Sequence, residues 1–126
     1  MKIAFDTICE ATVKSDIFDY SKIIFKALLY DEINIDNSHN LSLFMDILIS
    51  GGAKKILVDM ENLEYISSSG IGILINTAKQ LNDNSGTLVI MNVPHEIKHV
   101  LKIINLQNFI KIFDKENEAL EFLYNY

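Results

Sequence analysis

The fold is decided by residues 56–81, which read I-L-V-D-M-E-N-L-E-Y-I-S-S-S-G-I-G-I-L-I-N-T-A-K-Q-L. The apolar run at 56–58 is typical of a strand buried on both faces. The chain is expected to start leaving this strand at Asp59 and Asn62. Serines follow at 67–69, and apolar residues then recur at the spacing of one helix face: Ile71, Leu74, Ile75, Ala78 and Leu81. This stretch therefore predicts a strand, a serine turn and a helix that begins at the serines.

The serine turn places hydroxyl groups at a helix end that carries free N–H groups and a partial positive charge, which suits a bound or covalent phosphate. One serine suffices to cap a helix, at about 1 kcal/mol, so three in a row exceed what capping requires. A phosphate on one of them would bring a charge of about −1.5 to −2 to the favourable end of the helix dipole. We expect the fold to tolerate this charge and the binding of partners to change.

Length and composition bound the class of protein. The chain has 126 residues and is 49% hydrophobic, which fits one globular domain over residues 1–126. A net charge of −6 argues against nucleic acid as a partner, and no apolar run approaches the ~20 residues of a membrane span. With Cys9 as its single cysteine and no apolar leader, the protein is expected to be cytoplasmic.

Before the central stretch, residues 2–11 alternate in polarity and predict an edge strand within an N-terminal extension at 1–15, which could cover a sheet edge or form an oligomer with another subunit. Residues 23–30 predict a central strand that ends in the polar string after Tyr30, and 16–20 could form a short strand leading into it. Ser38 is expected to cap a helix that Gly51 and Gly52 end. Its core face comprises Leu41, Phe44, Met45 and Leu48.

Two apolar residues of that helix, Leu43 and Ile47, lie off its core face. Either the helix is buried more deeply than usual, or it presents apolar surface to a partner, and we favour the deeper burial.

Beyond the central stretch, residues 87–93 predict a buried strand, and Pro94 begins a helix. The core face of this helix is predicted to comprise Ile97, Val100, Leu101 and Ile104. A short strand at 109–113 precedes a last helix with Ala119, Leu120 and Leu123 on its core face. Alternation of this kind predicts an α/β fold: a mixed, mostly parallel sheet of four to five strands with about four helices and an extra N-terminal strand.

The sequence offers little support for catalysis or for a cofactor. His95 and His99 are four residues apart, but no cysteine or acidic partner stands at ligand spacing, so no metal is assigned. A serine nucleophile at Ser68 would need the G-x-S-x-G elbow, which is missing, and no P-loop motif occurs. We expect no enzyme activity.

The helix predicted after the serine turn carries four residues on its outer side: Gly72, Ile73, Asn76 and Gln80. Ile73 is expected to be exposed as contact surface, and Gly72 to allow close approach of a partner backbone.

Residues 56–75 resemble the STAS domain, specifically the bacterial anti-sigma factor antagonists. That family's pattern is a hydrophobic strand, then D-S-[ST]-G-[ILV]-G-x-[LI], then an amphipathic helix, which stands here as I-L-V-D-M-E-N-L-E-Y-I-S-S-S-G-I-G-I-L-I. The proline-led P-H-E-I-K-H-V-L-K-I-I-N-L and the closing E-A-L-E-F-L are similar to the family's P-x-x-V-x-x-x-L-x-x-x-G-L and its last helix. The resemblance runs from about Asp16 to the C-terminus.

The resemblance implies a binding protein switched by phosphorylation. In that family the unmodified antagonist binds an anti-sigma factor, typically a GHKL-type serine kinase, which phosphorylates it and so breaks the complex, and a PP2C-type phosphatase resets it. The phosphorylated position falls on Ser68. The partner-binding surface is expected to comprise Asn34, Ser67, Ser69, Gly70, Gly72, Ile73 and Asn76.

The chain departs from the family pattern at three positions. Ser67 stands where the family has the motif's Asp, Asn34 where it has the Asp of G-E-[LI]-D, and Asp31 where it has the glycine of that turn. The two lost carboxylates favour an alternative, in which the protein is a non-phosphorylated scaffold or a subunit of a stressosome-like, transporter or lipid-transport complex.

Overall fold

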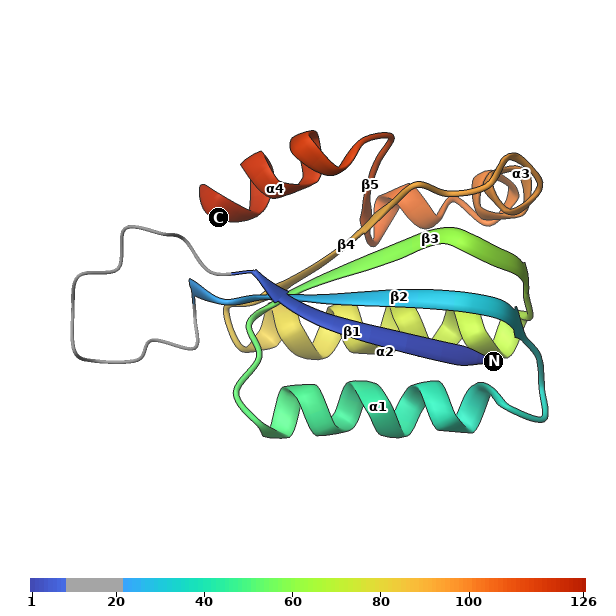
Figure 1. The fold of residues 1–126 in the computed structure, drawn as a ribbon, viewed down its shortest axis with the longest axis horizontal. Helices are drawn as coiled ribbons and strands as arrows, with labels where there is room; N and C mark the ends of the chain where they lie inside the picture. Colours follow the sequence, from blue (N-terminus) through green and yellow to red (C-terminus); the bar gives the residue numbers. More distant parts are fainter. Residues whose placement is uncertain (9–21) are drawn as a thin grey trace.

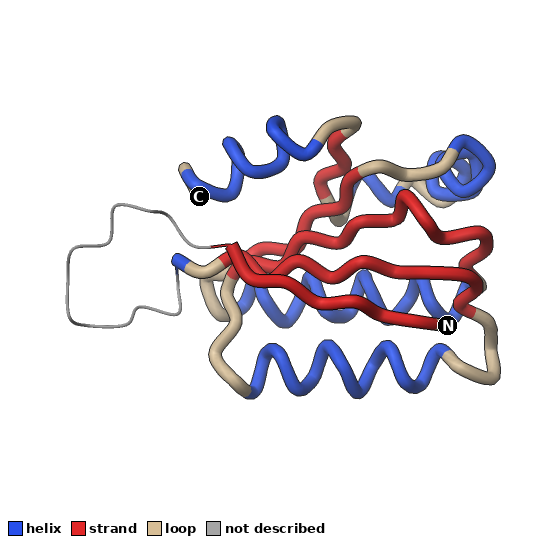
Figure 2. Tube along the Cα trace, viewed as in Figure 1, coloured by secondary structure: helices blue, strands red, loops and turns tan. Residues whose placement is uncertain are grey.

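The computed structural model describes residues 1–8 and 22–126, which form a five-stranded sheet flanked by four α-helices (Figures 1 and 2). The strands, in their order across the sheet, are β1 (Lys2–Ile8), β2 (Ile24–Ile33), β3 (Lys55–Ile66), β4 (Thr87–Met91) and β5 (Lys111–Phe113). The helices are α1 (Ser38–Ser50), α2 (Ser68–Asp83), α3 (His95–Ile103) and α4 (Glu116–Tyr124), with a 3-10 turn η2 at Leu106–Asn108. Strand β1 runs antiparallel to β2, and the other neighbours are parallel. The predicted fold class is confirmed.

The core has two parts because alternate side chains of each central strand point to opposite faces of the sheet. Ile56 and Val58 of β3 belong to the larger cluster, which α1 and α2 cover. Leu57, between them, belongs to the smaller cluster with Ala119 and Leu123 of α4. Helix α4 therefore packs on the face opposite to α1 and α2, where Lys26 of β2 bonds its first residue, Glu116, with an Nζ–Oε1 distance of 3.1 Å (Figure 1).

Both central strands run further than the sequence predicted. The sequence predicts that β2 ends after Tyr30 and that the chain starts to leave β3 at Asp59. The two strands nevertheless stay paired as far as Ile33 of β2 and Ile66 of β3. Ile33, Leu63 and Ile66 stay buried and hold the strands to the core, whereas the following polar residues of the extensions are exposed: Asp31, Glu32, Glu61, Asn62 and Glu64. Two register shifts adjust the pairing, and Asp31 adopts a φ of 65° beside one of them.

The N-terminal strand lies at the edge of the sheet, as predicted. The structure describes it only as far as Ile8, and both its predicted continuation to residue 11 and the predicted short strand at 16–20 lie outside the described residues. Phe5 fixes β1 to its neighbours, because its ring stacks on Phe25 at 5.7 Å and meets Phe44 of α1 edge-on at 5.9 Å.

Helix α1 differs from its prediction at its cap and on its outer flank. Asn37 is the N-cap residue, and Ser38 is the first helical residue and is buried. Leu43 is 48% exposed and Ile47 70% exposed, so the prediction of deeper burial was wrong. Leu41 and Met45 are buried in the core, and Phe44 and Leu48, also predicted on this face, are half-buried and pack against it.

The C-terminal elements are shorter than predicted. Strand β4 ends at Met91 because Asn92 turns the chain with a φ of 56°. Of the residues predicted on the core face of α3, Ile97 and Leu101 are buried. Val100 and Ile104 are exposed, because this short helix presents only a narrow stripe to the core. Strand β5 starts at Lys111 rather than at residue 109, because the N–H groups of Phe109 and Ile110 bond back to the carbonyl of Leu106 in η2.

The first prediction concerns Gly86, in the turn between α2 and β4. A Cβ at this residue would lie 2.5 Å from the carbonyl oxygen of Lys54 and 3.2 Å from Cδ2 of Leu81. Gly86→Ala should therefore lower the free energy of unfolding by about 1–3 kcal/mol, as overpacking does. Urea denaturation followed by circular dichroism measures this. Asn82→Ala, at an exposed position of the same turn region, is the control and should change stability by less than about 0.5 kcal/mol; equal stability of the two variants would contradict the prediction.

Candidate functional site at the start of α2

Ser67 connects β3 to α2. It is the N-cap residue of α2, with extended backbone angles, and its Oγ accepts a hydrogen bond from the N–H of Gly70 at 3.2 Å. Its own N–H donates to the carbonyl of Ile33 at 2.7 Å, and its carbonyl accepts from the N–H of Ile71 at 3.0 Å. The helix begins at the serines, as the sequence predicted, and its N-cap residue is held to the end of β2.

The serine hydroxyls form a chain that reaches a second helix. The Oγ atoms of Ser67 and Ser69 are 2.8 Å apart, and Ser69 donates to Oγ of Ser38 at 3.2 Å. Ser38 donates in turn to the carbonyl of Ile35 at 3.3 Å. Because the proton of Ser69 is used toward Ser38, the proton between Ser67 and Ser69 belongs to Ser67. The chain therefore runs in one direction, from the Gly70 N–H to the Ile35 carbonyl, and ties the starts of α1 and α2 together.

Ser68 stands apart from this chain. It is the first residue of α2, and it is exposed, whereas Ser67 is buried and Ser69 half-buried. Among the described residues, its hydroxyl has no hydrogen-bond partner. The N–H groups of the first helical turn have no acceptor within the helix, and Ser67 satisfies only that of Gly70. A group added to the Ser68 hydroxyl would thus meet solvent on one side and the N–H groups of the helix end on the other.

The loop before α1 is closed by two asparagines. The N–H of Asn34 donates to Oδ1 of Asn37 at 2.9 Å, and the N–H of Asn37 donates to Oδ1 of Asn34 at 3.0 Å. The amide nitrogen of Asn37 also donates to the carbonyl of Glu32 at 3.0 Å. This reciprocal pairing sets where α1 begins, and it places Ser38 within reach of Ser69.

Ser67 and Asn34, which stand where the resembled family has carboxylates, both use an oxygen atom to accept a backbone N–H. A carboxylate oxygen at either position could accept the same bond. The chain therefore keeps an acceptor oxygen at both positions without a negative charge. Asp31 adopts the left-handed conformation that glycine takes without strain.

The remaining residues predicted for partner binding differ in exposure. Asn76 is exposed, and a Cβ at Gly72 would have nothing within 4 Å, so the surface there is open. Gly70 is buried instead: a Cβ there would lie 2.8 Å from Cγ2 of Ile33 and 2.9 Å from Cγ1 of Ile66. Ile73, expected to be exposed, is half-buried and packs against the core, because α1 lies along that side of α2.

Sequence reasoning missed the role of Ser38, which it assigned to a helix cap. Nothing in the local pattern could have revealed the bond to Ser69, because the two residues are 31 positions apart and meet only when α1 and α2 pack. It also missed Ile35 and Tyr65, whose side chains are 78% and 51% exposed. Tyr65 lies near the end of β3, just before Ser67, and Ile35 lies in the β2–α1 loop, where its carbonyl accepts from Ser38, the partner of Ser69.

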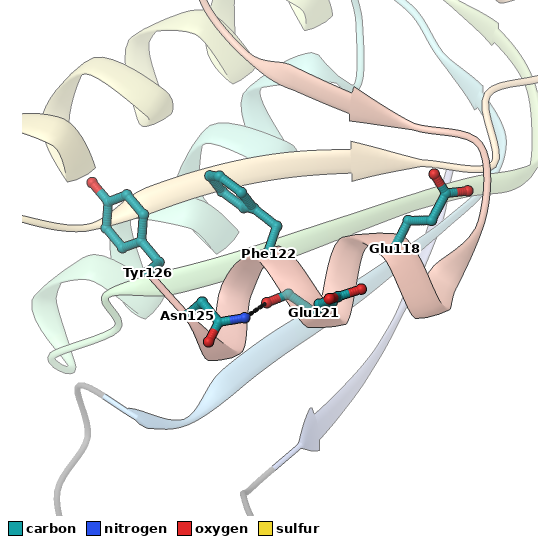
Figure 3. Close-up of a pocket in the computed structure, with 5 residues that line it drawn as sticks. All are labelled: Glu118, Glu121, Phe122, Asn125 and Tyr126. Carbon is teal, nitrogen blue, oxygen red and sulfur yellow. Dashed lines mark hydrogen bonds between the residues drawn. The ribbon is translucent and has the colours of Figure 1, made fainter.

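Two surface hollows lie apart from the serine turn. Figure 3 shows one of about 490 Å³ along α4, lined by Glu118, Glu121, Phe122, Asn125 and Tyr126. The second, of about 600 Å³, lies at α3, where His95 and His99 line it and Lys98 bonds Asp114 at 3.0 Å.

In residues 1–8 and 22–126 no group of three or more His, Cys, Asp or Glu side chains is placed to hold a metal ion. No helix of this part of the chain is long and apolar enough to cross a membrane.

Comparison with known proteins gives a consistent result. The family model described as the STAS domain matches residues 4–119. The TM1081 homologue of Thermotoga neapolitana, named as a proposed anti-sigma factor antagonist, is 32% identical over 91 residues, which cover 71% of this chain and 80% of the relative. The anti-sigma-B factor antagonist of Staphylococcus aureus is 33% identical over 70 residues, which cover 56% of this chain and 61% of the relative.

Solved structures agree with the sequence matches. The crystal structure of TM1081 from Thermotoga maritima superposes with a TM-score of 0.76 at 26% identity, covering 86% of this chain and 91% of that one. The anti-sigma factor antagonist SpoIIAA in its unphosphorylated form superposes with a TM-score of 0.70 over 98% of both chains. At 17% identity, the likeness to SpoIIAA shows a shared fold alone.

The second prediction uses the contrast between two glycines of α2. Gly70→Ala should lower the free energy of unfolding by about 1–3 kcal/mol, because its Cβ would press on two buried isoleucines. Gly72→Ala should raise it by about 0.5–1 kcal/mol, because alanine favours the helix and the space is open. Thermal and urea unfolding of the two variants measure both effects. Destabilisation by Gly72→Ala would show that the chain itself fills the space beside this residue.

Proposed function

The chain belongs to the STAS domain family, and on that basis we propose that it is an anti-sigma factor antagonist switched by phosphorylation of Ser68. The unmodified protein binds an anti-sigma factor that is also a GHKL-type serine kinase. Phosphorylation of Ser68 breaks this complex, and a PP2C-type phosphatase restores the unmodified form. The names of the relatives support the general role, and the geometry of the serine turn supports the switch.

One observation carries the choice of Ser68. Of the three serines, Ser67 and Ser69 have hydroxyls committed to the chain that joins α1 and α2, whereas Ser68 is exposed and stands outside it. Phosphorylation of Ser67 or Ser69 would break bonds that hold the two helices together. Phosphorylation of Ser68 breaks none of them.

The start of α2 can accommodate the added charge. The γ-phosphoryl group of ATP passes to Oγ of Ser68 as the hydroxyl loses its proton, and ADP leaves. The phosphate then adjoins the free N–H groups and the positive end of the helix dipole, where an anion is stabilised by about 0.3–1 kcal/mol. Ser67 is neutral, so the phosphate meets no repulsion from it. An aspartate at position 67 would place a second negative charge beside the phosphate.

The contact surface lies on the outer flank of α2. Ser68, Gly72 and Asn76 follow one another at intervals of four residues, so they lie on one side of the helix. The open space beside Gly72 lets a partner backbone approach closely. A phosphate at the start of this row introduces charge and bulk at the contact, which explains how a local change releases a whole partner.

The third prediction identifies the modified residue. When the protein is incubated with ATP and its proposed partner, an anti-sigma factor kinase, mass spectrometry should find one phosphate, on Ser68. Ser68→Ala should abolish the modification. Ser69→Ala is the matched control and should still be phosphorylated, because it removes a neighbouring hydroxyl and leaves Ser68 in place. Phosphate on another residue, with Ser68 unmodified, would refute the site.

The fourth prediction separates a switch from a constitutive scaffold. Ser68→Asp should weaken binding of the anti-sigma factor about tenfold or more, equivalent to about 1.4 kcal/mol, because it brings negative charge into the contact. Ser68→Asn has nearly the same shape without the charge and should bind within about threefold of the wild type. Calorimetric titration measures both. Equal affinities for the two variants would favour the scaffold.

A further inference from the structure

Strand β1 presents a free edge. It is the outermost strand of the sheet beside β2, and no strand within residues 1–8 and 22–126 pairs with its outer side. An edge strand carries a row of backbone N–H and C=O groups that can pair with another strand. Strand β1 is seven residues long, which is enough for such pairing.

The sequence of β1 is complementary to itself in one antiparallel register. If two copies of the strand pair with Ala4 opposite Ala4, then Lys2 of each copy stands opposite Asp6 of the other. In the same register Ile3 stands opposite Phe5. Directly opposite residues in an antiparallel pair have neighbouring side chains, so the register joins unlike charges on one face and apolar groups on the other.

The two faces of β1 agree with this arrangement. Ile3 packs against the cluster under α1 and α2, whereas Ile8 packs against the cluster under α4, so odd and even residues face opposite layers. Phe5 lies on the α1 side, in contact with Phe25 and Phe44, and remains 46% exposed. A neighbouring strand carrying an isoleucine opposite Phe5 would cover it.

Helix α1 extends the same apolar surface. Ser38 faces α2, because it bonds Ser69, and Ile47 lies nine residues later, which is about 180° around the helix. Ile47 and Leu43 therefore lie on the flank that faces away from α2, and both are exposed. Phe44, which contacts Phe5 of β1, lies on the same helix between this flank and the core.

We propose that these two features form one interface, through which two copies of this chain pair. The β1 strands join antiparallel about Ala4 to continue the sheet, and the outer flanks of the two α1 helices meet through Leu43 and Ile47. The occupant is a second copy because the charges of β1 complement those of β1 itself. The start of α2 follows β3, from which β1 is separated by β2, so both Ser68 hydroxyls stay accessible in the dimer.

Charge exchange tests the register. Sedimentation equilibrium of the wild-type protein, with no partner present, should show a dimer. Lys2→Asp and Asp6→Lys should each raise the dimer dissociation constant about tenfold, because each sets like charges opposite one another twice. The double exchange should return it to within about threefold of the wild type. A monomeric wild type, or a double variant no better than the singles, would overturn the proposal. None of these measurements depends on Ser68 or on an anti-sigma factor.

The α1 flank has a matched control. Ile47 and Ile103 are exposed to the same degree, 70% and 69%, and both lie on helices, but Ile103 belongs to α3. Ile47→Asp should raise the dissociation constant about tenfold or more by burying a charge in the interface, and Ile103→Asp should leave it unchanged. Circular dichroism confirms that each variant is folded. Equal effects of the two substitutions would remove α1 from the interface.

Disulfide cross-linking through a cysteine at position 4 tests directly whether the two β1 strands pair about Ala4. In a Cys9→Ser background, Ala4→Cys should form a disulfide-linked dimer on mild oxidation, because opposite Cα atoms of an antiparallel pair are about 4.5–5.5 Å apart. Thr7→Cys is the control and should stay monomeric on the denaturing gel, because residue 7 faces residue 1 of the other copy in this register. Cross-linking at position 7 instead of position 4 would refute the register.

Discussion

The hydrogen-bond chain from the N–H of Gly70 through Ser67, Ser69 and Ser38 to the carbonyl of Ile35 holds this structure together at the point where its function is proposed. It caps α2, it ties α2 to α1, and it leaves one hydroxyl outside. Because Ser67 also donates its N–H to Ile33, the same residue fixes the helix to the sheet. Ser67 and Ser69 use their hydroxyls in this chain, and Ser68 between them is left exposed.

The two missing carboxylates can be understood from the same contacts. Ser67 and Asn34 accept the backbone bonds that a carboxylate oxygen would accept, so the turn and the loop keep their form. The change is electrostatic: the surface around Ser68 has fewer negative charges before phosphorylation, and the phosphate has no charged neighbour at position 67 after it. On this account the substitutions remove the same negative charge from both states, so the change in charge on phosphorylation is that of the phosphate alone.

Sequence reasoning reached the features that depend on local pattern. The serine cap, the apolar face of α2, the edge position of β1 and the α/β order all follow from spacing and from the properties of individual residues. The choice of Ser68 as the phosphorylated residue rests on the family resemblance and stays a prediction. It failed where a residue's role depends on a distant element. Gly70 and Gly72 are two positions apart and look alike in the sequence, but Ile33 of β2 packs on the first and leaves the second open. The exposure of Leu43 and Ile47 likewise depends on how many neighbours α1 has.

The central claim is that the start of α2 accepts a phosphate on Ser68 without losing its cap. A ¹H–¹⁵N correlation spectrum of the protein phosphorylated at Ser68 tests this most directly. The account predicts downfield shifts of the Ser68 and Ser69 amides as they bond the phosphate, with the Gly70 amide and the resonances of the sheet nearly unchanged. Loss of dispersed resonances from α1 and the first turn of α2 would contradict it, because the helices would then have separated on phosphorylation.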